Sequence, residues 1–64
     1  MKYVLSAVLD SGEKVYATLV GKMAQISTTQ SKSDAVTFDQ RDNMNIKKMY
    51  YTTFTGINFQ VEQI

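Results

Sequence analysis

Two apolar runs within the first twenty positions have the residue types that are typical of β-strands, and the first of them has one strongly apolar side. Residues 3–9 are rich in β-forming side chains, and residues 15–20 repeat the pattern after a polar stretch that contains Gly12. Successive side chains of a strand point to opposite faces, and a glycine between two such runs accommodates a tight turn. The pattern therefore predicts an N-terminal β-hairpin, after which Gly21 marks a bend or bulge.

The alternation weakens in the middle of the chain. Residues 24–29 favour a short third strand, and residues 30–34 form a polar turn. Residues 35–38 are too few for a helix and include the β-branched Val36 and Thr37, so we expect a brief strand or an extended anchor whose Phe38 side chain points inward. Because segment 23–38 is rich in Ser, Thr and Gln, we expect it to cover a sheet face only incompletely.

Apolar residues recur at helical spacing in the C-terminal half. They predict a helix over residues 40–53 whose apolar stripe packs on the sheet. Asp39, with Asp42 three residues later, resembles an N-terminal cap, and Gly56 can supply the left-handed residue that ends the helix. The predicted buried stripe consists of Ile46, Met49, Tyr50, Thr53 and Phe54.

Strict alternation returns in residues 57–62 and predicts a final, half-exposed strand. The elements together predict a single α+β domain over residues 1–64: a small antiparallel sheet with one helix packed on one face. The sheet comprises the N-terminal hairpin, a short third strand and the C-terminal strand. The helix is expected to cover Tyr3, Leu5, Leu9, Ala17, Leu19, Ile57 and Phe59.

The composition narrows the chemistry that the chain can perform. It contains no Cys and no His, and its formal net charge is +1. The chain therefore lacks a thiolate nucleophile, an imidazole proton shuttle and the common nitrogen or sulfur metal ligands. Asp34, Asp39 and Asp42 do not have the spacing of a calcium loop. We expect a protein that is not an enzyme and has no cofactor or metal. The apolar run in residues 3–9 is too short to span a membrane, which favours a cytoplasmic location.

A secondary stripe of the predicted helix is a candidate partner surface. It combines an adaptable thioether and an aromatic ring, which are enriched at interfaces, with two lysines. The alternative is that Met44 lies at the edge of the core and Tyr51 lies flat on the surface without a partner. The candidate partner surface consists of Met44, Lys47, Lys48 and Tyr51.

The second face of the predicted sheet is more apolar than a solvated face needs to be. One helix covers only one face, and segment 23–38 is expected to cover the other incompletely. A second copy of the chain would complete the cover, so we expect a homodimer formed by symmetric pairing of sheets or sheet edges. The candidate dimer face consists of Val4, Val8, Tyr16 and Val20.

Nucleic-acid binding is the alternative to a function in protein–protein binding. Arg41, Lys47 and Lys48 could contact phosphates while Tyr51 stacks on a base. Three cations are fewer than such proteins usually present, and Tyr50 belongs to the predicted buried stripe. The composition therefore favours binding to another protein.

The order of short motifs along the chain is also informative. The chain starts with Lys2-Tyr3-Val4, continues through a Ser11-Gly12-Glu13 hairpin, and passes from Ser33-Asp34-Ala35 to Phe38-Asp39 before a helix and a final strand. In layout and size it resembles small uncharacterised accessory proteins encoded by phages and prophages of Gram-positive bacteria. It departs from them at residues 40–43, which are nearly neutral where such proteins often carry several acidic residues. The resemblance implies a protein that binds host or phage macromolecules, such as an inhibitor of host defence. It carries over no binding residue.

Overall fold

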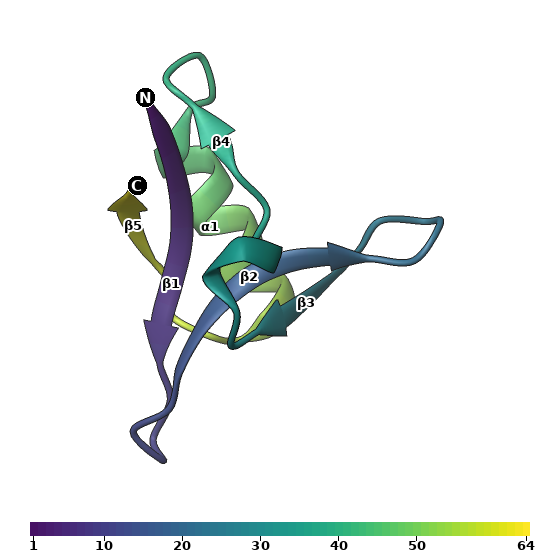
Figure 1. Cartoon of the computed structure of the whole chain (residues 1–64), viewed down its shortest axis with the longest axis vertical. Helices are drawn as coiled ribbons and strands as arrows, with labels where there is room; N and C mark the ends of the chain where they lie inside the picture. The colour runs from purple at the N-terminus through teal and green to yellow at the C-terminus, as the bar shows by residue number, and fades with distance from the viewer.

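The computed structural model describes residues 1–64, which form a five-stranded antiparallel sheet and one α-helix. The α+β fold expected from the hydrophobic pattern is therefore confirmed. Figure 1 shows the sheet with the helix behind it and a short 3-10 helix in front. In chain order the elements are β1 (Lys2–Val8), β2 (Lys14–Val20), β3 (Gln25–Thr29), the 3-10 helix η1 (Lys32–Asp34), β4 (Phe38–Asp39), α1 (Met44–Thr55) and β5 (Gln60–Gln63).

Strand β1 organises the sheet because it pairs with three other strands. Hydrogen-bonded neighbours follow the order β3-β2-β1-β4, and β5 pairs with β1 in addition. Ser6 lies opposite Tyr16 of β2 and Gln60 of β5, so these two strands occupy opposite edges of β1. Tyr3 lies opposite Phe38 of β4 and Gln63 of β5. Strands β2 and β4 therefore share one edge of β1.

The predicted N-terminal hairpin and third strand are confirmed. The extended segment of residues 35–38 lies where β1 and β2 separate. Pairing of β1 with β2 ends at Ser6 and Tyr16, after which β2 runs away from β1 (Figure 1). The Val36 amide donates a hydrogen bond of 3.0 Å to the Ala17 carbonyl of β2, just before β4 pairs with β1. Phe38 is buried here, as expected from its place in the anchor.

Helix α1 begins at Met44 rather than at residue 40, because Asn43 and not Asp39 caps it. The Asn43 side chain accepts a hydrogen bond of 3.3 Å from the Ile46 amide. The Asp39 carboxylate instead accepts from the Arg41 amide at 2.8 Å and from its guanidinium at 3.0 Å. Gly56 ends the helix with φ +76°, in the left-handed conformation that its sequence position predicts.

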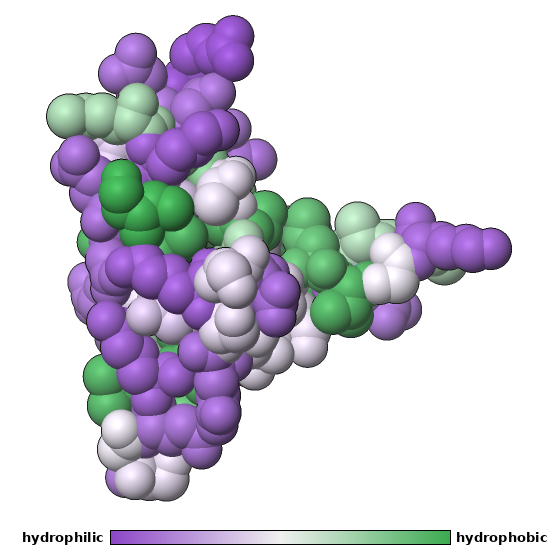
Figure 2. Space-filling model, in the orientation of Figure 1, coloured by the Kyte–Doolittle hydropathy of each residue, from purple (hydrophilic) through white to green (hydrophobic).

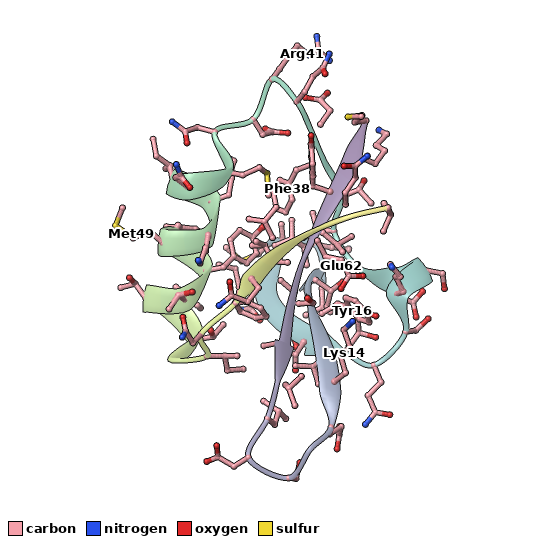
Figure 3. The ribbon with its side chains drawn as sticks, turned by 90° about the vertical axis from the view of Figure 1, so that its left-hand side faces the viewer. Lys14, Tyr16, Phe38, Arg41, Met49 and Glu62 are labelled. Atoms are coloured by element: carbon pink, nitrogen blue, oxygen red, sulfur yellow. The ribbon has the colours of Figure 1, made fainter.

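One face of the sheet forms the hydrophobic core with α1. Figure 3 shows the helix standing to one side of the strands, with Phe38 between it and the sheet. The buried apolar residues of this cluster are Leu5, Ala7, Val15, Ala17, Phe38, Tyr51 and Phe59.

The middle of the other face of the sheet is covered by the chain itself. Helix η1 lies on the side opposite α1 (Figures 1 and 3). The Thr18 hydroxyl of β2 donates a hydrogen bond of 2.6 Å to the Asp34 carbonyl, which holds η1 against the strand. Val4 is 0% exposed and Tyr16 is 8% exposed on this face. Val8 and Val20, which were assigned to the same face, are 68% and 46% exposed, so the expectation that segment 23–38 covers this face incompletely holds at its ends and not at Val4 and Tyr16.

The hairpin of β2 and β3 projects from the rest of the molecule as an arm (Figure 1). Figure 2 shows hydrophobic residues along this arm and mainly hydrophilic residues over the neighbouring η1. Leu19, Val20 and Met23 are the exposed apolar residues of the arm. The molecule measures 33 × 26 × 23 Å along its principal axes.

Candidate interaction surface

The side of helix α1 that faces the sheet is not the side that its apolar spacing predicts. Tyr51 is 6% exposed and belongs to the core cluster. Its ring meets the Phe38 ring edge to face, with centroids 5.8 Å apart. Burial raises the pKa of the Tyr51 phenol, because the charged form is poorly solvated there. The predicted buried stripe faces away from the sheet, and this prediction is corrected.

Two threonine hydroxyls explain why the helix takes this orientation. The chain returns from α1 to β5 through residues whose amide groups need hydrogen-bond acceptors. The Thr52 hydroxyl accepts from the Phe59 amide at 3.3 Å, and the Thr55 hydroxyl accepts from the Ile57 amide at 3.1 Å. Both threonines must therefore lie on the sheet side of the helix, the side that also carries Tyr51.

The orientation leaves four large apolar side chains in solvent, which we call the outer face of α1. Figure 3 shows Met49 pointing away from the sheet. The rings of Tyr50 and Phe54 lie beside each other, with centroids 6.4 Å apart. The outer face consists of Ile46 at 57% exposure, Met49 at 63%, Tyr50 at 58% and Phe54 at 65%.

The outer face is large for a chain of this size. Its four side chains follow the i, i+3, i+4, i+8 spacing of one helix surface, so they form a continuous patch. Monomeric soluble proteins rarely expose contiguous apolar patches of more than a few hundred Å², and larger patches mark interaction sites. Isolated exposed apolar residues need no explanation, but a patch of this kind does.

The candidate partner surface predicted from the sequence is only partly accessible. Tyr51 lies in the core and cannot contact a partner, which corrects that assignment. Met44 is half-buried and packs against the core, so the alternative reading of this residue is confirmed. Lys47 and Lys48 are half-buried. Lys47 borders the outer face, three residues before Tyr50, whereas Lys48 lies on the side of the helix that carries Tyr51. The buried Tyr51 ring also cannot stack on a base, and Arg41 is engaged with Asp39.

The candidate dimer face is corrected as well. Val4 and Tyr16 are buried by the chain itself, so they are not available to a second copy. Val8 and Val20 are exposed, at 68% and 46%. They lie at the ends of β1 and β2 and do not form a continuous apolar face with the buried pair.

A polar cluster on the η1 side of the sheet fastens η1 to β2 and β5. The Glu62 carboxylate accepts hydrogen bonds from Lys32 at 2.6 Å, Lys14 at 2.9 Å and Ser6 at 3.2 Å. Figure 3 shows Lys14, Tyr16 and Glu62 close together. The hydrogen bonds from Lys32 and Lys14 lower the pKa of Glu62 from 4.5 to about 2. The same contact raises the pKa of Lys14. The two lysines share one carboxylate, and the cluster has a structural role because it joins η1, β2 and β5.

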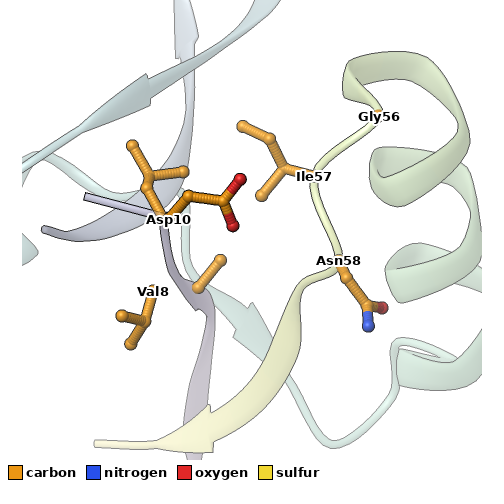
Figure 4. Close-up of a pocket in the computed structure, with 7 residues that line it drawn as sticks. Val8, Asp10, Gly56, Ile57 and Asn58 are labelled. Atoms are coloured by element: carbon orange, nitrogen blue, oxygen red, sulfur yellow. The ribbon is translucent and has the colours of Figure 1, made fainter. Parts of the chain in front are cut away.

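A shallow pocket of about 370 Å³ lies between the end of β1 and the connection from α1 to β5. Figure 4 shows Asp10 on one wall, with its carboxylate directed toward Ile57, and Gly56 and Asn58 along the other. Its lining combines apolar side chains with one carboxylate and no basic group. No nucleophile with an activating base lies in it, so its geometry supports no reaction.

Other chemistry considered from the sequence is not assembled by the fold. No three carboxylate side chains gather where they could hold a metal ion, so Asp34, Asp39 and Asp42 do not form a site. Asp39 is occupied by Arg41, whose hydrogen bonds lower the pKa of the Asp39 carboxyl. The single α-helix lacks the length and apolar character that a membrane span requires.

The sequence contains two patterns that favour different sides of α1 for contact with the sheet, and hydrophobic spacing alone does not decide between them. Thr52 and Thr55 lie on one side of the helix and the Ile46 stripe on another, so the two patterns compete for the sheet. Spacing favours the larger apolar residues. The return to β5 requires the hydroxyls, and that requirement becomes visible only once the connection is known to be short.

Comparison of the chain with protein-family models, with curated proteins and with solved structures finds no match. The functional argument therefore depends on the geometry of this chain.

Proposed function

We propose that this protein is a small non-enzymatic binding protein that recognises another protein through the outer face of α1. The observation that carries the proposal is the exposure of Ile46, Met49, Tyr50 and Phe54 on one side of a helix whose other side packs on the core through Tyr51. Apolar area of this kind contributes to binding when a partner removes it from water.

The resemblance to phage accessory proteins supports a more specific form of this proposal. Such a protein would act in the host cytoplasm as a modulator or inhibitor, by occupying a surface of a host protein. This mode of action needs no cofactor and no catalytic group. It requires only a stable scaffold that presents one surface, and the covered second face of the sheet supports that requirement.

The proposal includes a homodimer only if the two copies meet through surfaces that are exposed in the single chain. The outer face of α1 groups four exposed apolar side chains, so self-association through apolar contact would use this helix and not the sheet face. Light scattering at micromolar concentration distinguishes a dimer from a monomer. A dimer that the outer-face variant described below leaves intact would contradict a role of α1 in self-association.

Affinity capture from a lysate of a Gram-positive bacterium tests the main proposal when three forms of the chain are compared. The outer-face variant carries Met49→Ser with Phe54→Ser. The matched control carries Val8→Ser with Val20→Ser, which removes exposed apolar side chains from the sheet. We expect a protein that the wild type and the control retain and the outer-face variant loses. The same proteins retained by all three forms, or none retained by any, would contradict the proposal. Circular dichroism checks that all three forms are folded.

A further inference from the structure

Strand β3 forms one edge of the sheet, and no strand pairs with its outer side. It pairs with β2 along its whole length, from Tyr16 opposite Thr29 to Val20 opposite Gln25, and with no other strand. It belongs to the arm that projects from the rest of the molecule (Figure 1). The outer side of β3 is therefore a free sheet edge.

Two residues of β3 direct their backbone groups to this free edge. The Ala17 carbonyl of β2 accepts a hydrogen bond of 3.0 Å from the Val36 amide, so the backbone groups of Ala17 point away from β3. Thr28 lies opposite Ala17, and its N–H and C=O groups therefore point away from β2. This direction alternates along a strand, so the groups of Ile26 point the same way. No other part of the protein supplies a hydrogen-bond partner for these four groups.

Strand β3 lacks the features that protect sheet edges from other chains. Natural edge strands commonly carry a charged side chain, a proline or a bulge that prevents further pairing. The sequence of β3 is Gln-Ile-Ser-Thr-Thr, and its register with β2 continues without a bulge. Strand β5, at the opposite edge of the sheet, carries the charged Glu62. The edge of β3 is therefore the better site for pairing with another strand.

We propose that the free edge of β3 pairs with the same edge of a second copy of the chain, which extends the sheet across a twofold axis. Antiparallel pairing centred on Ser27 sets Ile26 opposite Thr28 of the other copy. The free N–H and C=O groups of these two residues then bond to each other, and the axis repeats the pair. Four hydrogen bonds form in a single register, because the free residues lie on either side of Ser27.

The side chains that this pairing brings together are compatible. Ile26 meets Thr28 on one face of the extended sheet, and two β-branched side chains pack well across strands. Ser27 meets Ser27 on the other face, and no like charges meet because β3 has no charged residue. An extended segment of another protein can bond to the same backbone groups, but nothing in β3 selects its sequence. The second copy matches both the spacing of the free groups and the uncharged side chains.

This inference does not rest on the proposed function, and the two are compatible. The pairing uses backbone groups of β3 and not the apolar side chains of α1. A twofold axis between antiparallel strands is perpendicular to the sheet, so both copies of α1 lie on the same side of it. Met49 points away from the sheet (Figure 3), so pairing at the edge leaves it exposed. The dimer would present two outer faces to one partner, and such bivalence strengthens binding without a new contact.

Sedimentation equilibrium over a wide range of concentrations tests the association. An edge of five residues buries less than the roughly 800 Å² per partner of a standard interface, so the dimer is weak. We expect the mean mass to rise from that of one chain toward that of two between about 10 µM and about 1 mM.

A charge exchange at Ser27 tests the register, because Ser27 faces its own counterpart across the axis. Ser27→Lys and Ser27→Glu should each weaken the association about fivefold, since like charges then lie directly opposite. An equimolar mixture of the two variants should restore the association to the wild-type level or above. Gln25→Lys and Gln25→Glu are the matched controls. Gln25 lies opposite Thr29 in this pairing, so each control alone should associate as the wild type does.

Thr28→Pro provides a second test that does not depend on charge. It removes an amide that points outward, so pairing with β2 keeps its hydrogen bonds while the dimer loses two of its four. The variant should remain monomeric, and circular dichroism checks that it is folded.

Several results would overturn this inference. They are a mass of one chain even at about 1 mM, an association that Ser27→Lys leaves unchanged, a mixture that associates no better than either charge variant alone, and a dimer that Met49→Ser with Phe54→Ser abolishes. If the chain is monomeric but lysate capture depends on the outer face, the proposed function stands without the dimer. If the dimer forms through β3 but capture does not depend on the outer face, only the proposed function fails.

Discussion

The ring of Phe38 meets the ring of Tyr51 edge to face, with centroids 5.8 Å apart and planes at 86°. Phe38 comes from the short strand beside β1 and Tyr51 from the middle of α1, so this contact fixes the rotation of the helix over the sheet. Edge-to-face pairs of aromatic rings are favourable beyond the area they bury. The exposure of the outer face follows from this rotation.

The first prediction compares Tyr51 with Phe54. Because Tyr51 fills the core, Tyr51→Ala should reduce the free energy of unfolding by about 3 to 5 kcal/mol. Phe54→Ala should change it by about 0.5 kcal/mol or less, because the side chain is mostly exposed. Urea or guanidinium melts measure both values. A loss for Phe54→Ala as large as that for Tyr51→Ala would restore the orientation that the apolar spacing predicts.

Local patterns predicted most of the strands because their causes are local. The alternation in residues 3–9 and 15–20 requires no knowledge of the rest of the chain, and the same is true of the positive φ at Gly56. The rotation of α1 depends on contacts between distant segments. Spacing within the helix contains no information about Phe38, and hydropathy ranks Thr52 below Phe54 even though the hydroxyl has a backbone amide to satisfy.

The burial of Val4 and Tyr16 on the second sheet face was not predicted from the sequence for a similar reason. The Ser, Thr and Gln content of segment 23–38 indicated that it is too polar to cover an apolar face completely. The structure covers that face with hydrogen bonds and ion pairs as well as apolar contact, since Lys32 reaches Glu62 across 30 residues of sequence. Of the four residues assigned to the candidate partner surface, only Lys47 keeps a place beside the outer face. It does so because a charged side chain at the edge of a packed helix stays partly in solvent.

The second prediction concerns the start of the helix. Asn43→Ala should reduce the free energy of unfolding by about 1 kcal/mol, because the Ile46 amide loses its acceptor. Asn43→Asp should retain most of the stability, since a carboxylate also caps a helix. Asn45→Ala is the matched control and should cause no loss, because Asn45 is exposed within α1. Thermal melts followed by circular dichroism would refute the assignment if Asn45→Ala were the more damaging change.

The third prediction concerns the end of the helix. Gly56 has φ +76°, and a Cβ atom added to it would meet no neighbouring atom within 4 Å. Gly56→Ala should therefore lower stability by about 1 kcal/mol through backbone strain alone. Gly56→Asn should lower it less, because asparagine tolerates the left-handed region better. Equal melting midpoints for Gly56→Ala and the wild type would show that the helix can end in another conformation.

The last prediction follows from the pKa of Glu62, which the hydrogen bonds from Lys32 and Lys14 lower from 4.5 to about 2. A carboxyl group whose pKa is lower in the folded state stabilises the fold when it is ionised. This stabilisation is fully present above the unfolded pKa of 4.5 and is lost as the pH falls toward 2. Asp39, whose pKa is also lowered, adds an effect of the same sign.

Glu62→Gln separates the Glu62 contribution from that of the other carboxyl groups. The variant should be less stable than the wild type at neutral pH, and the difference should shrink as the pH falls toward 2, because protonation has then removed the same charge from the wild type. Asp10→Asn removes a carboxylate that has no ion pair, and its stability should follow the wild type across the pH range. Denaturant melts at a series of pH values measure these differences. If the wild type and Glu62→Gln lose stability in parallel, the contact of Lys14 and Lys32 with Glu62 does not hold η1 to the sheet.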